Sequence, residues 1–299
     1  MLEMELQLQK RGVKMKLLIS VNDKELSKYL NFTDSFIIGL KDYSVNYYEL
    51  SIEEIEKLLK KYNDINLFIS INKNLFNKDL ESLEEYLIKL DKLKIKGVLF
   101  YDLSILAIVK RLNLNIPLVY HQGHLVTNYN ICNFYKSLGC EYAYLSTEIT
   151  ADEMKEICLK CDLKLMAYFI GHPIISHSKR KLISNYYKQI KKDNKNNINI
   201  IHEQNKDTKY YIKENKLGTD ILTYDILNGT EAFIYLKDKI EYSVLDNNLI
   251  DDDLFIKILS LYKDYLDNKI SDHKLINEMK KLIGSDSGFF YKKTIYRVK

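Results

Sequence analysis

The sequence predicts an α/β protein built on a (β/α) barrel of the TIM type, and two observations support this prediction. Seven short apolar runs alternate with helical segments, at a repeat of about 20–30 residues. The runs are continuous rather than alternating, as is typical of parallel strands that are covered on both faces. No Gly-x-Gly-x-x-Gly follows the first run, which makes an open dinucleotide-binding sheet the weaker alternative.

Each predicted strand is a short run of aliphatic and aromatic residues. The runs are 16–20, 35–40, 66–71, 97–101, 117–120, 142–145 and 163–170. Helices are expected between them at 23–30, 51–62, 80–93, 105–112, 129–138 and 150–160. Two of these helices begin with a capping box, Ser51 with Glu54 and Thr150 with Glu153. The barrel core is therefore expected to span residues 15–187.

The pattern changes on both sides of this core. Residues 188–250 hold short β-branched and aromatic runs, which predict a β-rich segment that completes or decorates the barrel. These runs are 198–203, 209–214, 221–224, 232–236 and 240–245. Residues 251–299 predict two helices, 254–266 and 275–283, and a terminal strand within 288–298. Residues 1–14 lack a pattern and predict a flexible extension. The barrel is thus complete, incomplete or distorted, depending on what residues 188–250 add.

Composition and charge bear on whether the protein binds nucleic acid or a membrane. The 299 residues include 45 Lys and Arg against 41 Asp and Glu, a balance that does not by itself indicate a nucleic-acid partner. The stretch from His172 to Lys195, however, holds seven Lys and Arg against one Asp. The sequence has no secretory signal and no apolar run long enough to span a bilayer, so we expect a cytoplasmic protein that makes no membrane contact.

Functional groups of such a barrel are expected just past the carboxyl ends of its strands. The candidate catalytic residues at these positions are Asp102, His121, His172 and His177. The candidate substrate-binding residues are Glu148, Ser178, Lys179, Arg180, Lys181, Ser184, Asn185 and Tyr186. A strand that is followed directly by imidazole, hydroxyl and cationic groups is typical of anion-binding or catalytic sites. Each residue also has a structural interpretation, and Asp102 is more simply an N-cap.

The run from Ser176 to Tyr186 (SHSKRKLISNY) resembles the signature of the collagenase-like peptidases of unknown catalytic type, peptidase family U-32. The closing segment 287–296 (SGFFYKKTIY) and Asn128 are similar to further features of that family. The resemblance covers most of the chain from Met15 onward. It implies the TIM-type barrel and, by the family name, peptide hydrolysis. Neither Gly-x-Ser-x-Gly nor His-Glu-x-x-His is present to support hydrolysis independently.

The resemblance also implies a second activity, because some family members are implicated in hydroxylating RNA bases, including the wobble uridine of tRNA. Cluster-bearing relatives have two cysteines in the signature, where this chain has Ile174 and Lys181. We therefore expect no iron–sulfur cofactor and no metal. A short, cysteine-poor member of this kind is expected to work on tRNA beside a cluster-bearing paralogue. Cys132, Cys140, Cys158 and Cys161 are expected to be buried thiols.

A third hypothesis is a non-catalytic barrel whose mouth binds a small anion through Lys179, Arg180 and Lys181. All three hypotheses assume that the cationic turn faces the same cavity as His121 and Asp102. The substrate is accordingly a peptide, tRNA or a small anion.

Overall fold

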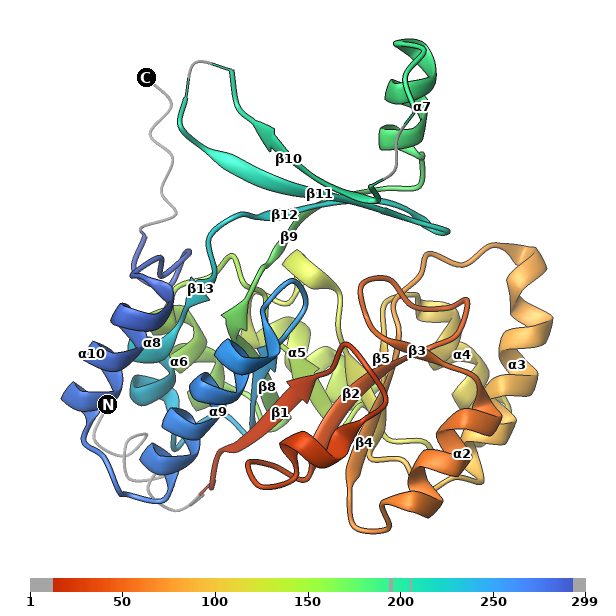
Figure 1. Ribbon diagram of the computed structural model, residues 1–299. Coiled ribbons are helices and arrows are strands. Elements are labelled where there is room, and N and C mark those ends of the chain that lie inside the picture. Colours follow the sequence, from red (N-terminus) through yellow and green to blue (C-terminus); the bar gives the residue numbers. More distant parts are fainter. Residues whose placement is uncertain (1–12, 194–195, 205, 293–299) are drawn as a thin grey trace.

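The computed structural model describes residues 13–193, 196–204 and 206–292, and eight parallel strands close into a barrel within them (Figure 1). The strands are β1 (Lys16–Ser20), β2 (Ser35–Leu40), β4 (Asn66–Ile71), β5 (Gly97–Phe100), β6 (Leu118–Tyr120), β7 (Tyr142–Tyr144), β8 (Lys164–Gly171) and β14 (Tyr242–Asp246). Strand β14 pairs with both β8 and β1, and β1 pairs with β2, so the ring is complete. The predicted TIM-type barrel is confirmed.

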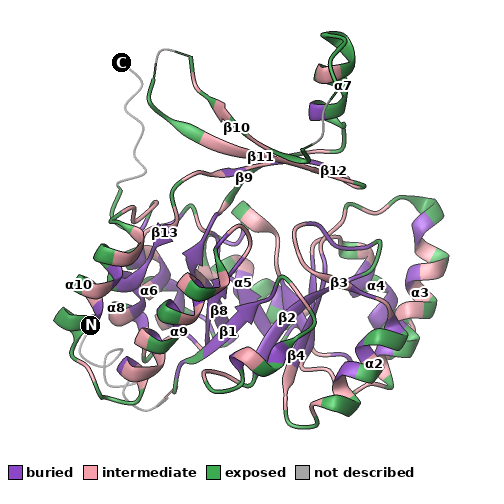
Figure 2. Cartoon of the chain, in the orientation of Figure 1, coloured by how far each residue is buried: buried purple, intermediate pink, exposed green. Residues whose placement is uncertain are grey.

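Large buried side chains fill the inside of the barrel. They are Leu18, Ile37, Phe68, Leu99, Val119, Tyr142, Tyr144, Met166, Tyr242 and Val244. The Phe68 ring meets the Tyr142 and Tyr242 rings edge to face, at centroid distances of 5.6 and 5.2 Å. Burial of each such side chain contributes about 1.5–3 kcal/mol. The strands are accordingly buried along most of their length (Figure 2), and the barrel is a packed core with room for a ligand at its mouth.

Helices and short turns surround the barrel, and the turn at 123–125 lies at its mouth. They are η1 (Leu26–Tyr29), α2 (Ile52–Lys61), α3 (Asn77–Asp91), α4 (Leu103–Arg111), η2 (Gly123–Leu125), α5 (Tyr129–Ser137), α6 (Ala151–Lys160), α8 (Thr230–Leu236), α9 (Asp252–Leu266) and α10 (Asp272–Ile283). Both predicted capping boxes are confirmed: Ser51 caps α2 and Thr150 caps α6. No helix among the described residues is both long and apolar enough to cross a bilayer.

A second sheet lies outside the barrel and above its mouth (Figure 1). It contains β9 (Ile174–Ser178), β10 (Ile198–His202), β11 (Lys209–Asn215) and β12 (Gly218–Thr223), all antiparallel in the order β10-β11-β12-β9. Helix α7 (Leu182–Gln189) lies between β9 and β10 in sequence. We call residues 174–223 the arm. Residues 188–250 therefore both decorate and complete the barrel, because β14 supplies its eighth strand.

Several boundaries differ from the predictions. The run 232–236 is helix α8 rather than a strand, because a five-residue apolar run has no periodicity that separates the two states. The loop expected after the seventh strand is strand β9, which pairs with β12 at a distance in sequence. Residues 288–292 form turns rather than the start of a strand. Residues 293–299, and residues 1–12 of the predicted extension, lie outside the described residues. Two short pairings, β3 (Glu49–Leu50) and β13 (Leu227–Asn228), extend the barrel sheet.

Two glycines allow the arm to leave the barrel and fold over it. Gly171 has a φ of 139°, and a Cβ atom there would lie 2.0 Å from the Tyr168 hydroxyl oxygen. Gly218, at the turn between β11 and β12, has a φ of 146°, and a Cβ would lie 2.1 Å from the Ser178 carbonyl oxygen. Both backbones are in a region that L side chains rarely adopt, so these positions require glycine.

Candidate active site

A cavity of about 480 Å³ lies at the carboxyl ends of the barrel strands, where β9 of the arm borders it. Its walls come from the barrel loops and from the arm. The lining residues are Val45, Asn46, Tyr47, Asn72, Asn74, Tyr101, His121, Gly123, His124, Tyr144, Leu145, Thr147, Glu148, Tyr168, His172, Pro173, Ile174, Ile175, Ser176, His177, Asp220, Asp246 and Asn248. Its size is that of a small-molecule site.

An imidazole and a buried carboxylate face each other in this cavity. His177 Nδ1 lies 2.6 Å from Asp220 Oδ1, and the register of β9 and β12 pairs the two residues directly. Asp220 is fully buried, whereas the His177 side chain is partly exposed. A carboxylate that accepts the Nδ1 proton leaves Nε2 as the basic nitrogen of the neutral ring. His177 is therefore the best-placed proton acceptor and donor of the site.

A second polar cluster lies at the end of β14. Asp246 Oδ2 accepts a hydrogen bond from the Tyr168 hydroxyl at 3.2 Å, and Asp246 Oδ1 accepts the Asn248 amide at 3.1 Å. Burial raises the pKa of Asp246, which favours its neutral form. Lys213 of β11 reaches down from the arm and donates to Asn248 Oδ1 at 2.9 Å, and burial lowers the pKa of this lysine. The arm thus supplies a desolvated ammonium group to the barrel mouth.

His121 follows β6 and stacks on Tyr144, with ring centroids 4.2 Å apart. Burial lowers the pKa of His121 to about 4, so the imidazole is neutral at physiological pH. His172 has a different role, since its Nδ1 donates to the Thr223 carbonyl at 3.0 Å and so joins the two ends of the arm. Burial also lowers the pKa of His172.

Five buried polar atoms of the lining residues lack a hydrogen-bond partner within the described part of the chain. They are Asn46 Nδ2, Asn46 Oδ1, His121 Nδ1, Asp220 Oδ2 and Asn248 Nδ2. An unsatisfied buried polar atom costs about 1–3 kcal/mol, and such atoms are rare in native proteins. Their concentration around one cavity indicates a ligand that offers both hydrogen-bond donors and acceptors. The rings of Tyr47, Tyr144 and Tyr168 suit a flat ligand.

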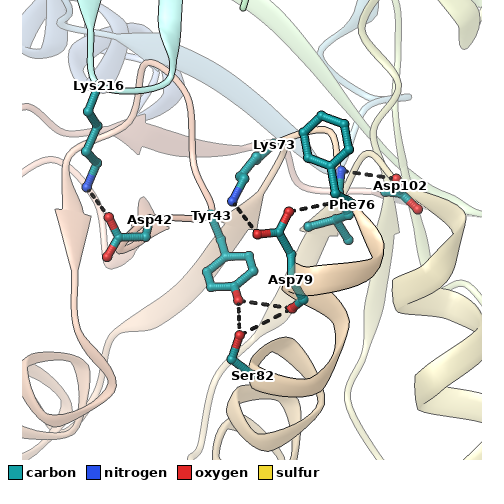
Figure 3. A network of polar contacts seen from close by, with 9 residues as sticks. Asp42, Tyr43, Lys73, Phe76, Asp79, Ser82, Asp102 and Lys216 are labelled. Atoms are coloured by element: carbon teal, nitrogen blue, oxygen red, sulfur yellow. Dashed lines mark hydrogen bonds and ion pairs between the residues drawn. The ribbon is translucent and has the colours of Figure 1, made fainter.

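The predicted residues are only partly brought together. His121, His172, His177 and Glu148 line the cavity, whereas Asp102 and the cationic turn 179–181 do not. The expectation that Arg180 and Asp102 face the same cavity as His121 is therefore wrong. Asp102 caps α4, with Oδ1 accepting the Ser104 amide at 2.9 Å, and it also accepts the Leu75 amide (Figure 3). Its structural interpretation is confirmed.

Three lysines of the arm hold it on the rim of the barrel, and each lysine is one point of contact. Lys216 descends from the turn between β11 and β12 to Asp42 and Glu49, at 2.6 and 2.8 Å (Figure 3 shows the Asp42 pair). The Lys179 ammonium lies 3.8 Å from the centroid of the Phe76 ring. The bond from Lys213 to Asn248, described above, is the third contact.

The signature residues after the cationic turn build the arm. Ser184 donates from its amide and its hydroxyl to the carboxylate of Glu214 on β11, and this fixes the start of α7. Asn185 and Tyr186 are exposed on α7. Ser178 Oγ accepts the Arg180 amide at 3.2 Å. The proposed substrate-binding roles of these residues therefore concern a surface outside the cavity and stay predictions.

The two signature positions considered above for a cluster, 174 and 181, carry no thiol in this chain. Ile174 is an exposed apolar residue at the start of β9, and Lys181 is an exposed ammonium group at the start of α7. The four cysteines are buried thiols that pack in the outer layer of the core, and the described lining residues of the cavity include none of them. Among the described residues, no group of three or more His, Cys, Asp and Glu is arranged to hold a metal ion.

Sequence reasoning missed Lys213, Asp220, Asp246 and Asn248. Asp246 ends the eighth barrel strand and Asn248 comes just after it, so the rule that found His121 finds both as soon as 240–245 is recognised as a barrel strand. No sequence pattern around Lys213 or Asp220 indicates that these residues belong to the site. They reach the site only through the pairing of β11, β12 and β9.

Comparison with known proteins identifies the family to which the sequence is similar. The sequence profile of Peptidase family U32 matches residues 25–296. The "tRNA hydroxylation protein P2" of Bacillus subtilis (strain 168) is 23% identical over 286 residues, which cover 88% of this chain and 92% of that protein. The "tRNA hydroxylation protein P1" of the same organism is 26% identical over 158 residues, which cover 51% of this chain and 37% of that protein. One organism thus holds two paralogous relatives.

Among solved structures, one match is to a U32 peptidase. It is 9% identical, with a TM-score of 0.49, and the match covers 79% of this chain and 93% of that one. An oxaloacetate acetylhydrolase matches with 8% identity and a TM-score of 0.43 over 93% of each chain.

Proposed function

This chain belongs to peptidase family U32, and on that premise we propose that it works in tRNA hydroxylation and receives one unpaired base of the tRNA in its cavity. The single observation that carries the proposal is the set of five unpartnered buried polar atoms around a cavity with tyrosine walls. The similarity to two tRNA hydroxylation proteins supports it.

The chemistry of the cavity suits a neutral, flat heterocycle. A uracil ring presents carbonyl acceptors and an N–H donor along its edge, and two π faces. The amides of Asn46 and Asn248 can supply both donors and acceptors, and Asp220 Oδ2 is an acceptor. Enzymes that modify a base within RNA take the base out of the stack and hold it between aromatic and apolar side chains. The neutral imidazole of His121, whose pKa burial lowers to about 4, suits an uncharged base.

We propose His177 as the group that moves protons during the reaction. Asp220 accepts from Nδ1, so the opposite nitrogen can take a proton from the bound base or return one. Tyr168 and Asp246 lie on the β8–β14 side of the cavity and would hold the edge of the base. These roles require only groups that this chain contains.

We further propose that this chain carries no iron–sulfur cluster and acts beside a cluster-bearing paralogue. Ile174 and Lys181 occupy the two signature positions at which the resemblance implies cysteines in cluster-bearing members, which supports the first part. The two paralogous relatives in one organism support the second. We place the protein in the cytoplasm, where tRNA is found and where four buried thiols without a disulfide are stable.

Mass spectrometry of tRNA nucleosides tests the proposal. A strain that lacks this chain and its paralogue should lose 5-hydroxyuridine derivatives. Restoring both chains should recover them, and restoring the paralogue with the His177→Gln variant should not. The His202→Gln variant, which changes an exposed histidine of the arm, is the matched control and should restore them. Unchanged 5-hydroxyuridine in the double deletion would dismiss the proposal.

Peptide hydrolysis is the second candidate, and the observation that favours it is again the His177–Asp220 pair. An imidazole held by a carboxylate can activate water or a hydroxyl group. Two hydroxyls of the signature are engaged elsewhere, since Ser178 accepts the Arg180 amide and Ser184 donates to Glu214, but Ser176 lines the cavity beside His177. Purified protein with gelatin and a peptide library tests this candidate. Cleavage that the His177→Ala variant retains would count against it.

A further inference from the structure

The arm differs in charge from the rest of the molecule. By sequence, residues 174–223 hold eleven Lys and Arg against five Asp and Glu, an excess of six positive charges. The whole chain has an excess of only four, so the rest of the molecule has two more acids than bases. A small unit with this excess, lying above the mouth of the barrel (Figure 1), attracts polyanions.

Four positive charges near α7 are exposed and have no ionic partner among the residues that the structure describes. Arg180, Lys188, Lys191 and Lys192 are exposed, and no carboxylate of the described residues lies within ion-pair distance of them. They lie within thirteen residues of one another in sequence, around one short helix. Like charges so close together repel one another, so they do not help the arm to fold. Their arrangement is instead typical of a surface that meets phosphate groups.

Helix α7 also presents an aromatic and apolar stripe to solvent. Leu182, Tyr186 and Ile190 recur every four residues, and Tyr186 is 57% exposed. The helix is firmly attached, because Glu214 binds the Ser184 amide and hydroxyl, and Thr219 Oγ1 accepts the Leu182 amide at 2.9 Å. An exposed tyrosine on a rigid helix, flanked by cations, is a platform on which a base can stack.

One strand connects this surface to the cavity. Ile174, Ile175, Ser176 and His177 of β9 line the cavity, and the chain then passes through the cationic turn 179–181 into α7. The five residues of β9 span on the order of 15 Å. A single RNA strand can therefore reach both places.

We propose that α7 and the cations Arg180, Lys188, Lys191 and Lys192 bind the phosphate backbone of tRNA next to the base that enters the cavity. This inference rests on the proposed function, because it takes tRNA as the substrate. The inference assigns to α7 and its cations the binding of a polynucleotide in preference to a free base. RNA fits better than a protein partner because the apolar stripe is narrow and the groups around it are cationic.

Filter binding of unfractionated tRNA at several salt concentrations tests the inference. The arm variant changes Arg180, Lys188, Lys191 and Lys192 to Ala. The matched control changes Lys57, Lys94, Lys257 and Lys274 to Ala, which removes four exposed charges outside the arm. The arm variant should bind tRNA at least about 10-fold more weakly near 0.15 M salt, with a salt slope smaller by about 3. The control variant should bind nearly as the parent chain does.

A second pair of variants tests the stacking platform. Tyr186→Ala should weaken tRNA binding about 10-fold. Phe134→Ala, which removes an equally exposed ring from α5, should not. Equal binding by the arm and control variants, with melting temperatures like the parent's, would overturn the inference. An arm variant that keeps its tRNA affinity but no longer co-elutes with the paralogue would assign the surface to a protein instead.

The outcomes separate this inference from the proposed function. Loss of hydroxylated uridine in the double deletion, with tRNA binding that does not depend on the arm, contradicts only the inference. Arm-dependent binding with unchanged hydroxylated uridine contradicts only the proposed function. A parent chain that does not bind tRNA contradicts the inference whatever the nucleoside analysis gives.

Discussion

His177 and Asp220 face each other across the β9–β12 pair, with His177 Nδ1 2.6 Å from Asp220 Oδ1. The two residues are 43 positions apart in sequence, and the antiparallel register of the arm brings them together at the cavity. The buried carboxylate fixes the orientation and tautomer of the imidazole. The arm therefore contributes to the cavity and is not an attachment to a finished barrel.

Replacing the carboxylate of this pair should inactivate the site without unfolding it. Asp220→Asn preserves the volume but can present an N–H group to His177 Nδ1, which favours the wrong tautomer. We expect tRNA hydroxylation to fall by about 100-fold or more. The rate at which hydroxylated uridine appears in tRNA measures this. Asp193→Asn, an exposed carboxylate of the same arm, is the control. Equal activity of the two variants would refute the role of Asp220.

The buried imidazole of His121 should make stability depend on pH. The pKa of His121 is lowered by burial to about 4, whereas an unfolded histidine has a pKa of about 6.5. Between these values the unfolded chain binds a proton that the folded chain excludes. Stability is therefore lost as the pH falls from about 6.5 towards 4, by at most about 3 kcal/mol.

Urea denaturation at pH 7 and pH 4.5 measures this loss. His121→Gln removes the titrating group, so the difference in unfolding free energy between the two pH values should shrink. His124→Gln removes an imidazole from the same loop and serves as the control. If the parent chain and His121→Gln lose the same stability, the loss arises elsewhere.

The barrel could be predicted from sequence because its strands are locally visible. Runs such as Ser35–Leu40 are continuous and apolar, and burial on both faces requires that pattern whatever their neighbours are. The run Ala232–Leu236 was misassigned because five apolar residues fit a strand or a buried helix equally well. In the structure this run is the helix that connects β13 with β14, and that connection cannot be read from the run itself.

The residues of the candidate site likewise fall into those that local sequence patterns identify and those that they do not. His121 and His177 follow predicted strands, and position alone identified them. Asp246 ends β14, and the sequence pattern leaves open whether this strand belongs to the barrel or decorates it. Asp220 depends on strand pairing between distant hairpins, which no local pattern encodes. Arg180 was misplaced because β9 continues past the cavity and carries the cationic turn away from it.

The ion pairs of Lys216 should hold the arm down without contributing much to global stability. The lysine and Asp42 are both exposed, and such pairs are worth less than about 1 kcal/mol. Lys216→Ala should therefore leave the melting temperature nearly unchanged but speed hydrogen exchange in β11 and β12. Lys280→Ala breaks the exposed pair with Glu231, away from the arm, and is the control. Equal exchange in the two variants would show that Lys216 does not fasten the arm.

Gly171 should tolerate no side chain, because any replacement there would suffer both backbone strain and a steric clash. Its φ of 139° is strained for any L residue, and an added Cβ would collide with the Tyr168 hydroxyl at 2.0 Å and with Asp246 Cβ at 2.9 Å. Gly171→Ala should lower the free energy of unfolding by about 3 kcal/mol and also weaken tRNA hydroxylation, because Tyr168 and Asp246 must move.

Gly139→Ala separates the two costs. Gly139 also has a positive φ, 92°, but an added Cβ would meet nothing within 4 Å. Its replacement should therefore cost only the backbone strain, about 1 kcal/mol, and leave hydroxylation unchanged. Urea denaturation and nucleoside analysis of both variants measure the contrast. Equal losses of stability would mean that the backbone conformation, and not the approach of Tyr168 and Asp246, makes glycine necessary at position 171.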